Sequence, residues 1–160
     1  MCSSDLDTFT YKVNDGTVDS NTSTVTITIA AVNDAPTTAD VADSTDEDTS
    51  VDVTLSGSDV DTGDTLTYSV VTDPSNGTVI NNNDGTVTYT PSANYNGTDT
   101  FTYKVNDGTV DSNTSTVTIT VNPVNDAPTS ADVADSTDED TSVDVTLSGS
   151  DVDTGDTLTY

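Results

Sequence analysis

Aspartates gather directly ahead of a short strand-like segment at two places in the chain. The sequence SDVDTGDTLTY occurs at 58–68 and again at 150–160, with three aspartates within six residues each time. If the segment VNDAP at 32–36 lies against the first of these loops, Asp34 joins the group. Two carboxylates about 4 Å apart repel by roughly 4 kcal/mol at an effective dielectric constant near 20. A ligand set of oxygens without histidine or cysteine favours Ca²⁺ or Mg²⁺ over zinc or copper, and Ca²⁺ tolerates irregular oxygen shells that Mg²⁺ does not.

The overall charge leaves most of the carboxylates without a protein cation to pair with. The 160 residues contain 29 acidic side chains, two lysines, and neither arginine nor histidine, for a net charge of −27. Such a chain has no basic footprint for nucleic acid and no polybasic segment for anionic lipid. The single cysteine, Cys2, excludes a disulfide framework and a thiolate metal site. No apolar run reaches the length of a membrane span.

The chain repeats itself with a period of 92 residues. The segment 7–28 returns unchanged at 99–120, and 39–68 returns unchanged at 131–160. We therefore expect the C-terminal part of one repeat at 1–32, a complete repeat at 33–124, and the N-terminal part of a third at 125–160, as in a piece cut from a longer array. The opening MCSSDL breaks the repeat, so we expect residues 1–6 to be foreign or artefactual.

Within a repeat the apolar residues alternate with polar ones, mostly threonine, which is the pattern of a half-buried strand. Turn sequences such as DPSNG, NNNDG and NDG separate these runs. Counting a weak first strand near 39–44, the pattern predicts about seven short strands per repeat. We expect an all-β fold of tandem immunoglobulin-like or cadherin-like Greek-key sandwiches. Tyr95 is either a corner tyrosine or a core aromatic.

Six motifs in order carry a family resemblance. VNDAP, DEDTS, SDVDTGDTLTYSV, DGTVTYTP, NYNGTDTFTYKVNDG and STVTITVNPVNDAP together resemble bacterial cadherin-like or immunoglobulin-like tandem repeats of large secreted, RTX-type adhesins. The resemblance implies calcium at the junctions between consecutive domains. Each ion would be held by the linker, the base of the preceding domain and the top of the following one.

The same resemblance implies the ligands. They come from the DxD loop, the linker, the later top loop, and an early glutamate that serves the junction below its own domain. The residues are Asp59, Asp61, Asp151 and Asp153; Asn33, Asp34, Asn125 and Asp126; Asp107; and Glu47. The Leu-Asp-Arg-Glu element of classical cadherins is missing, which leaves the number of ions per junction open. We expect neither junction to hold every group within this chain.

Several alternatives compete with junctional calcium. The carboxylates could form a passive acidic surface, as we expect for much of the remaining charge. An EF-hand is excluded because no glutamate closes the DVDTGD loop. We expect no enzyme, since histidine is absent and identical repetition suits a structural unit. A carbohydrate-binding module has Tyr95 as its one candidate platform, and the TSTVTIT threonines could bind ice, although ordinary β propensity explains them.

We therefore expect a calcium-binding spacer of a large adhesin at the bacterial surface or in the extracellular medium. Its direct partners would be the neighbouring repeats of the same chain, with cell-surface or matrix ligands bound by other parts of the parent protein. We expect neither nucleic-acid binding nor membrane insertion.

Overall fold

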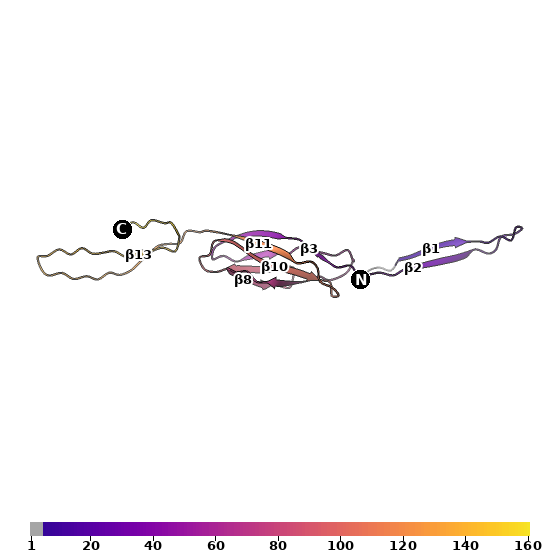
Figure 1. Ribbon diagram of the computed structural model, residues 1–160, viewed down its shortest axis with the longest axis horizontal. Coiled ribbons are helices and arrows are strands. Elements are labelled where there is room, and N and C mark those ends of the chain that lie inside the picture. The colour runs from indigo at the N-terminus through magenta and orange to yellow at the C-terminus, as the bar shows by residue number, and fades with distance from the viewer. Residues whose placement is uncertain (1–4) are drawn as a thin grey trace.

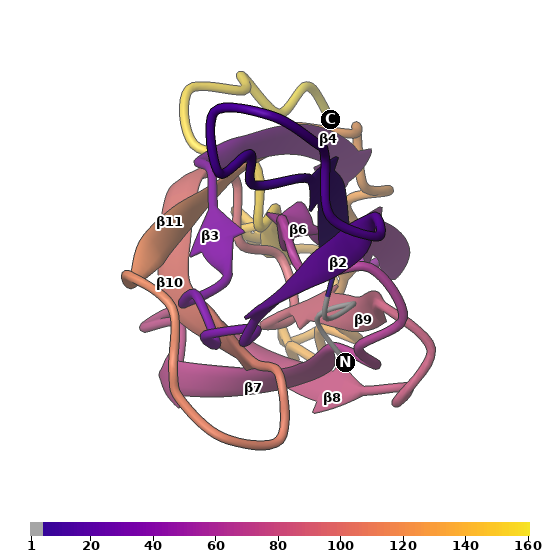
Figure 2. The ribbon, with the colours of Figure 1, turned by 90° about the vertical axis from the view of Figure 1, so that its right-hand side faces the viewer.

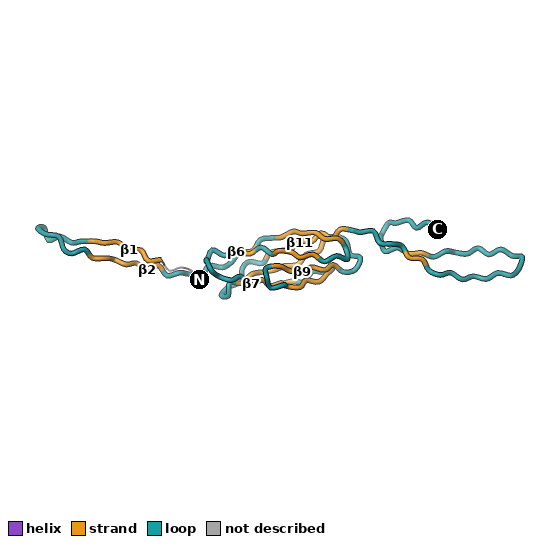
Figure 3. The backbone as a smooth tube through the Cα atoms, turned by 180° about the vertical axis from the view of Figure 1, so that it is seen from behind, coloured by secondary structure: helices purple, strands orange, loops and turns teal. Residues whose placement is uncertain are grey.

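The computed structural model describes residues 5–160, and all of its regular structure in that range is β (Figure 3). Residues 1–4, most of the stretch expected to be foreign, lie outside the described residues. Within the described range no helix is long and apolar enough to cross a membrane. A hairpin, a sandwich and an extended C-terminal segment follow one another along the long axis (Figure 1).

The N-terminal hairpin consists of β1 (Asp5–Tyr11) and β2 (Ser23–Ile29), which pair antiparallel. Its sequence is that of β10 and β11 in the sandwich, and its register is the same: Phe9 faces Val25 just as Phe101 faces Val117. The hairpin forms a sheet of its own.

The larger sheet of the sandwich has the order β4-β11-β10-β7. These strands are β4 (Val41–Asp46), β7 (Thr67–Thr72), β10 (Gly97–Asn106) and β11 (Ser115–Asn122). β10 pairs antiparallel with both of its neighbours, whereas β4 runs parallel to β11. The predicted weak first strand is therefore present, with β4 placed two residues later than expected.

The second sheet has the order β5-β9-β8, from β5 (Val51–Thr54), β8 (Gly77–Asn81) and β9 (Thr86–Pro91). A separate short pair is formed by β3 (Thr37–Thr38) and β6 (Gly57–Ser58). The first strand of the sandwich therefore begins as β3 against β6 and then crosses to β11 as β4. In the end-on view β11 and β10 lie on one side of the domain and β9 on the other (Figure 2). Taking β3 with β4 and β5 with β6, seven strands form the immunoglobulin-like sandwich that the sequence predicts.

The core lies between the two sheets and follows the two-residue period. Its members are the inward-facing residues of the central strands, because successive side chains of a strand point to opposite faces. Fully or almost fully buried are Val53, Leu55, Val87, Tyr89, Phe101, Tyr103, Val117, Ile119 and Val121. Tyr95 packs against this cluster, and its hydroxyl donates to the carbonyl of Thr98 (2.8 Å). A corner tyrosine bonds upstream instead, so Tyr95 is a core aromatic with its own downstream contact.

Asp99 is a buried carboxylate at the start of β10. It accepts the backbone N–H groups of Ser75 (3.1 Å) and Asn76 (2.9 Å), and the hydroxyl of Tyr89 (3.0 Å). Burial, followed by the hydrogen bond to Asp99, raises the pKa of the Tyr89 hydroxyl above its usual range. The carboxylate thereby ties the turn after β7 to the core.

The C-terminal segment contains only β12 (Thr129–Ser130) and β13 (Gly149–Ser150), which pair as β3 and β6 do. Residues 131–148 form no strand, although the identical sequence at 39–56 forms β4 and β5. In the sandwich those two strands pair with β11 and β9. Local sequence alone therefore does not hold these residues in strands; their partners do.

Candidate metal centre

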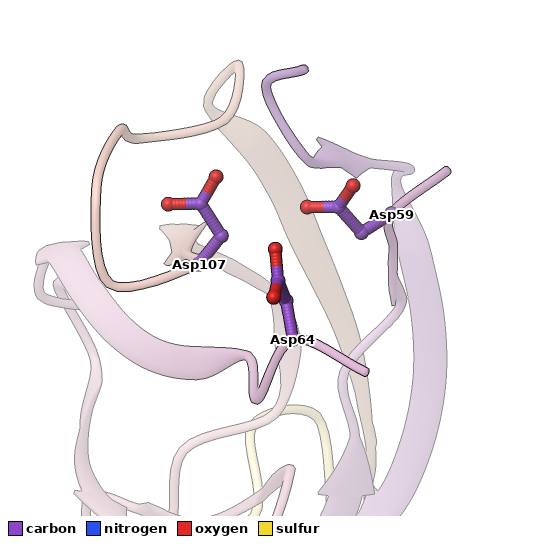
Figure 4. A group of neighbouring side chains, drawn as sticks. All are labelled: Asp59, Asp64 and Asp107. Carbon is purple, nitrogen blue, oxygen red and sulfur yellow. The ribbon is translucent and has the colours of Figure 1, made fainter. Parts of the chain in front are cut away.

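One end of the sandwich brings three carboxylates together from two loops. Asp59 and Asp64 lie on the loop between β6 and β7, and Asp107 follows β10. Their ligand oxygens lie within 4.8 Å of one another, and Figure 4 shows the three side chains converging from both loops. Gly63 turns the first loop with a φ of 104°, a conformation that favours glycine. We call Asp59, Asp64 and Asp107 the upper cluster.

Hydrogen bonds keep Asp107 oriented and charged. Its Oδ1 accepts the backbone N–H groups of Thr109 (2.6 Å) and Val110 (2.7 Å), and its Oδ2 accepts the amide of Asn33 (2.9 Å). The contact with Asn33 first, and then the backbone donors, hold the pKa of Asp107 below its usual range. Asp107 is therefore ionised at neutral pH.

The linker ahead of the sandwich, VNDAP at 32–36, is hydrogen-bonded to the DxD loop that contains Asp59 and Asp61. The N–H of Asp34 donates to Oδ2 of Asp61 (2.8 Å), and the N–H of Asp61 donates to Oδ1 of Asp59 (2.9 Å). The other carboxylate oxygen of Asp59, Oδ2, is buried and has no hydrogen-bond partner within residues 5–160. A buried polar atom without a partner is costly, so this oxygen fits a cation ligand.

The opposite end of the sandwich meets the next linker through Glu47. Glu47 is buried, its Oε1 accepts the N–H of Val124 (2.6 Å), and its own N–H donates to the carbonyl of Asn122 (2.9 Å). These two bonds join the turn between β4 and β5 to the chain leaving β11. Glu47 therefore lies at the junction below its own domain, where the resemblance places it.

Asp126 sits among the carboxylates of both repeats at this junction. Burial raises its pKa most, and the negative charges of Asp153, Asp48, Glu47 and Asp151 raise it further, in that order. Its Oδ2 is the second buried carboxylate oxygen without a hydrogen-bond partner in the described part of the chain. We call Glu47, Asp48, Asp126, Asp151 and Asp153 the lower cluster.

The two linkers have the same local geometry. The N–H of Asp126 donates to Oδ2 of Asp153 (2.7 Å), as that of Asp34 does to Asp61. Beside the second linker, a pocket of about 390 Å³ is lined in part by Asn125, Asp126, Asp151 and Asp156. These are the repeat equivalents of Asn33, Asp34, Asp59 and Asp64, so the same acidic groups recur 92 residues on.

The residues that the resemblance implies thus divide into two groups. The structure brings Asp59 together with Asp107, and Glu47 close to Asp126, Asp151 and Asp153. The other residues make contacts at the linkers. The side chain of Asp61 accepts a hydrogen bond from the N–H of Asp34, whose own side chain is exposed. The side-chain amides of Asn33 and Asn125 each donate to the carbonyl of the next residue.

Two cluster members are additional to the ligands that the resemblance implies. Asp64 completes the upper cluster, and Asp48 faces Asp126 in the lower one. Both had a signal in the sequence. Asp64 belongs to the same run of three aspartates as Asp59, and Asp48 directly follows Glu47.

The donor set suits a hard cation. Every side-chain ligand atom in both clusters is a carboxylate oxygen, which Ca²⁺ prefers. Neither lysine belongs to a cluster: Lys104 pairs with Asp111, and Lys12 lies beyond β1 in the hairpin. At each end one buried carboxylate oxygen lacks a donor among the described residues. At the upper cluster three ligand oxygens also converge within 4.8 Å of one another, so the residues present there fit a bound Ca²⁺.

Comparison with known proteins gives a family match and matches to solved structures, three of which are described below. The profile of a family described as bacterial Ig domain matches residues 33–120. No curated protein matches the chain.

Among solved structures, the endo-fucoidan hydrolase MfFcnA4 from glycoside hydrolase family 107 is 23% identical, with a TM-score of 0.45 over 74% of this chain. A variant of it gives a TM-score of 0.46 at the same identity and coverage. The endo-fucoidan hydrolase MfFcnA9 is 18% identical over 74% of this chain, with a TM-score of 0.42. The match covers only 19% of MfFcnA4 and 22% of MfFcnA9.

Proposed function

The chain belongs to the family of bacterial Ig domains, and from that premise we propose that it is a non-catalytic spacer of a large extracellular adhesin, with Ca²⁺ bound at the junctions between its repeats. A bacterial Ig domain fits a structural spacer. The calcium and the adhesin context are the parts that we add.

The position of the two linkers supports the spacer role. Asn33 enters the sandwich beside Asp107, whereas Val124 leaves it beside Glu47 at the other end. The hairpin and the C-terminal segment accordingly extend from opposite ends of the sandwich (Figure 1). Repeats joined in this way add length along one axis, which is what a spacer requires.

The observation that carries the calcium proposal is the pair of buried, partnerless oxygens, Asp59 Oδ2 and Asp126 Oδ2. Each lies in a group of neighbouring carboxylates, and Lys104 pairs with Asp111 outside both groups. Burial raises the pKa of Asp126 most, and four neighbouring carboxylates raise it further because their charges repel its own. Bound Ca²⁺ would supply the positive charge that offsets this repulsion and would accept oxygens from both repeats at once.

Some residues of the chain would bind the cations, and others would hold the linkers in place. Asp59, Asp64 and Asp107 would hold a cation at the upper end, and Glu47, Asp126, Asp151 and Asp153 would hold one at the lower end. Asp61 and Glu47 additionally fix the linkers by accepting backbone N–H groups. An ion shared by the linker and both domains would restrict bending at the junction.

The adhesin context rests on the resemblance of the ordered motifs to adhesin repeats. An extracellular location agrees with a site of modest affinity, since extracellular modules bind calcium at roughly 10⁻⁴ to 10⁻³ M. In this proposal the neighbouring repeats are the direct partners, and other parts of the parent protein would contact the target surface.

Equilibrium calcium binding by the 160-residue chain tests the proposal. We expect dissociation constants of about 10⁻⁴ to 10⁻³ M, with fewer ions bound after Asp59→Asn at the upper cluster or Asp126→Asn at the lower one. Asp73→Asn, which removes one exposed carboxylate outside both clusters, is the matched control. Absence of binding at millimolar calcium, or equal losses in all three variants, would leave a passive acidic spacer.

A further inference from the structure

The dipeptide Asn-Gly occurs twice in the chain, at 76–77 and at 96–97, and threonine follows it both times. This dipeptide favours spontaneous loss of the asparagine side-chain amide, because the nitrogen of a glycine can approach the asparagine Cγ without interference from a Cβ. The two sites are therefore closely similar in their local chemistry. The fold holds them very differently.

The first site is held on both sides of the reacting peptide. The N–H of Asn76 donates to Oδ2 of the buried Asp99 (2.9 Å), and the carbonyl of Asn76 accepts the N–H of Ser92 (2.8 Å). Gly77 opens β8 and packs closely, since a Cβ there would lie 2.6 Å from the carbonyl oxygen of Thr90. Rotation of this peptide into a reactive geometry would break these contacts.

The second site lies in the turn between β9 and β10, where both Asn96 and Gly97 are exposed. Gly97 has a φ of 132°, which favours glycine. The nearest atoms to a Cβ at this position would all belong to the side chain of Tyr95, the closest being its hydroxyl oxygen at 3.2 Å. No backbone packs against Gly97 as that of Thr90 does against Gly77, so the peptide at 96–97 has room to rotate.

We propose that Asn96 is a site of self-modification, where the chain converts the side-chain amide to a carboxylate without an enzyme, and that the fold protects Asn76 from the same reaction. The nitrogen of Gly97 attacks Cγ of Asn96, and the bond between Cγ and the amide nitrogen breaks. That nitrogen leaves as ammonia with the proton of the Gly97 N–H, and a cyclic succinimide remains. Solvent water then opens the ring at either carbonyl, which gives aspartate or isoaspartate.

The modified turn belongs to the lower end of the sandwich. The N–H of Asn94, in the same turn, donates to Oδ1 of Asp48 (3.1 Å), which is a member of the lower cluster. Conversion of Asn96 therefore adds a negative charge to a turn that is hydrogen-bonded to this cluster. Isoaspartate also carries the main chain through the side-chain methylene and so lengthens the entry into β10. The reaction needs no cation, so it can be tested independently of the calcium proposal.

Peptide mapping by mass spectrometry tests this inference on the full chain, incubated with chelator in warm, mildly alkaline buffer. Aspartyl and isoaspartyl peptides are separated by chromatography and counted together. We expect Asn96 to lose its amide at least about ten-fold faster than Asn76, because Asn76 reaches a reactive geometry only through local opening of the fold. In concentrated urea the two rates should become similar, since Gly-Thr follows both asparagines.

Two variants assign the reaction to the two sites. Asn96→Gln should stop the reaction at this position, because glutamine would have to close a larger ring, and should leave the slow reaction at Asn76 unchanged. Asp99→Ala should speed the reaction at Asn76, because it removes the acceptor of the Asn76 N–H. Equal rates at the two asparagines of the folded parent chain, or a faster reaction at Asn76, would overturn the inference. So would a rate at Asn76 that urea does not raise.

Discussion

Calcium at ten- to a hundred-fold above its dissociation constant is expected to raise the melting temperature of the chain by about 6 to 20 °C. Such an excess adds about 1.4 to 2.7 kcal/mol for each site that forms only in the folded state. A stabilisation of 1 kcal/mol raises the melting temperature of a domain of this size by roughly 4 to 8 °C. Thermal unfolding followed by circular dichroism, with calcium or with chelator, measures the shift.

Variants of the upper cluster separate specific binding from general screening of charge. Asp59→Asn and Asp64→Asn should each remove most of the shift contributed by the upper site, because each deletes one of three converging carboxylates. Asp73→Asn should keep the shift. Mg²⁺ at equal concentration should stabilise less, since it requires near-ideal octahedral geometry. Equal shifts in all variants and with both ions would contradict a defined calcium site.

Replacing Asp99 by alanine should lower the free energy of unfolding by about 3 to 5 kcal/mol, because three donors would lose one shared acceptor. The N–H groups of Ser75 and Asn76 and the Tyr89 hydroxyl would each lose their acceptor. A buried donor left unsatisfied costs about 1 to 3 kcal/mol. Urea unfolding monitored by tyrosine fluorescence measures the loss.

The repeat supplies a matched control for this variant. Asp7 is the repeat equivalent of Asp99 and is followed by the same residues, but it is exposed in β1, so Asp7→Ala should change stability by less than about 0.5 kcal/mol. Tyr89→Phe removes only one of the three donors and should cost about 1 kcal/mol. If Asp99→Ala were no more damaging than Asp7→Ala, the buried hydrogen-bond network would not support the fold.

The alternation of apolar residues was sufficient to predict the sandwich and its core. Val53, Val87, Phe101 and Tyr103 occupy inward positions because the two-residue period fixes which face each side chain takes. The same period carried a signal for Asp99, which has the phase of Phe101 and Tyr103. Its burial was not predicted because the donors that make it tolerable, Ser75 and Asn76, come from a turn more than twenty residues away.

Residues 131–148 show where local sequence ceases to determine structure. They repeat 39–56 without change, yet only the copy inside the sandwich forms β4 and β5. The difference lies in their pairing partners, since β4 and β5 bond to β11 and β9. Strand formation here depends on long-range pairing, which a local pattern does not contain.

The residues of the candidate site could be predicted from the sequence, but their hydrogen bonds and side-chain directions could not. The DxD loop, the linker and Glu47 lie at the two junctions, as the resemblance to cadherin-like repeats implies. The sequence did not show that Asp61 accepts the N–H of Asp34 and so fastens the linker. Which of two neighbouring aspartates turns toward the cluster depends on loop geometry, and here Gly63 sets that geometry through its positive φ.

Small-angle X-ray scattering of the 160-residue chain, with calcium and with chelator, tests whether calcium stiffens the junctions between repeats. The data should be extrapolated to low protein concentration so that association between copies does not contribute. We expect calcium to order the lower junction, so that the maximum dimension becomes larger and the distribution of distances narrower. Asp126→Asn should reduce this response, and Asp73→Asn should leave it intact. An unchanged maximum dimension on adding calcium to the parent chain would contradict the claim that calcium stiffens the junctions.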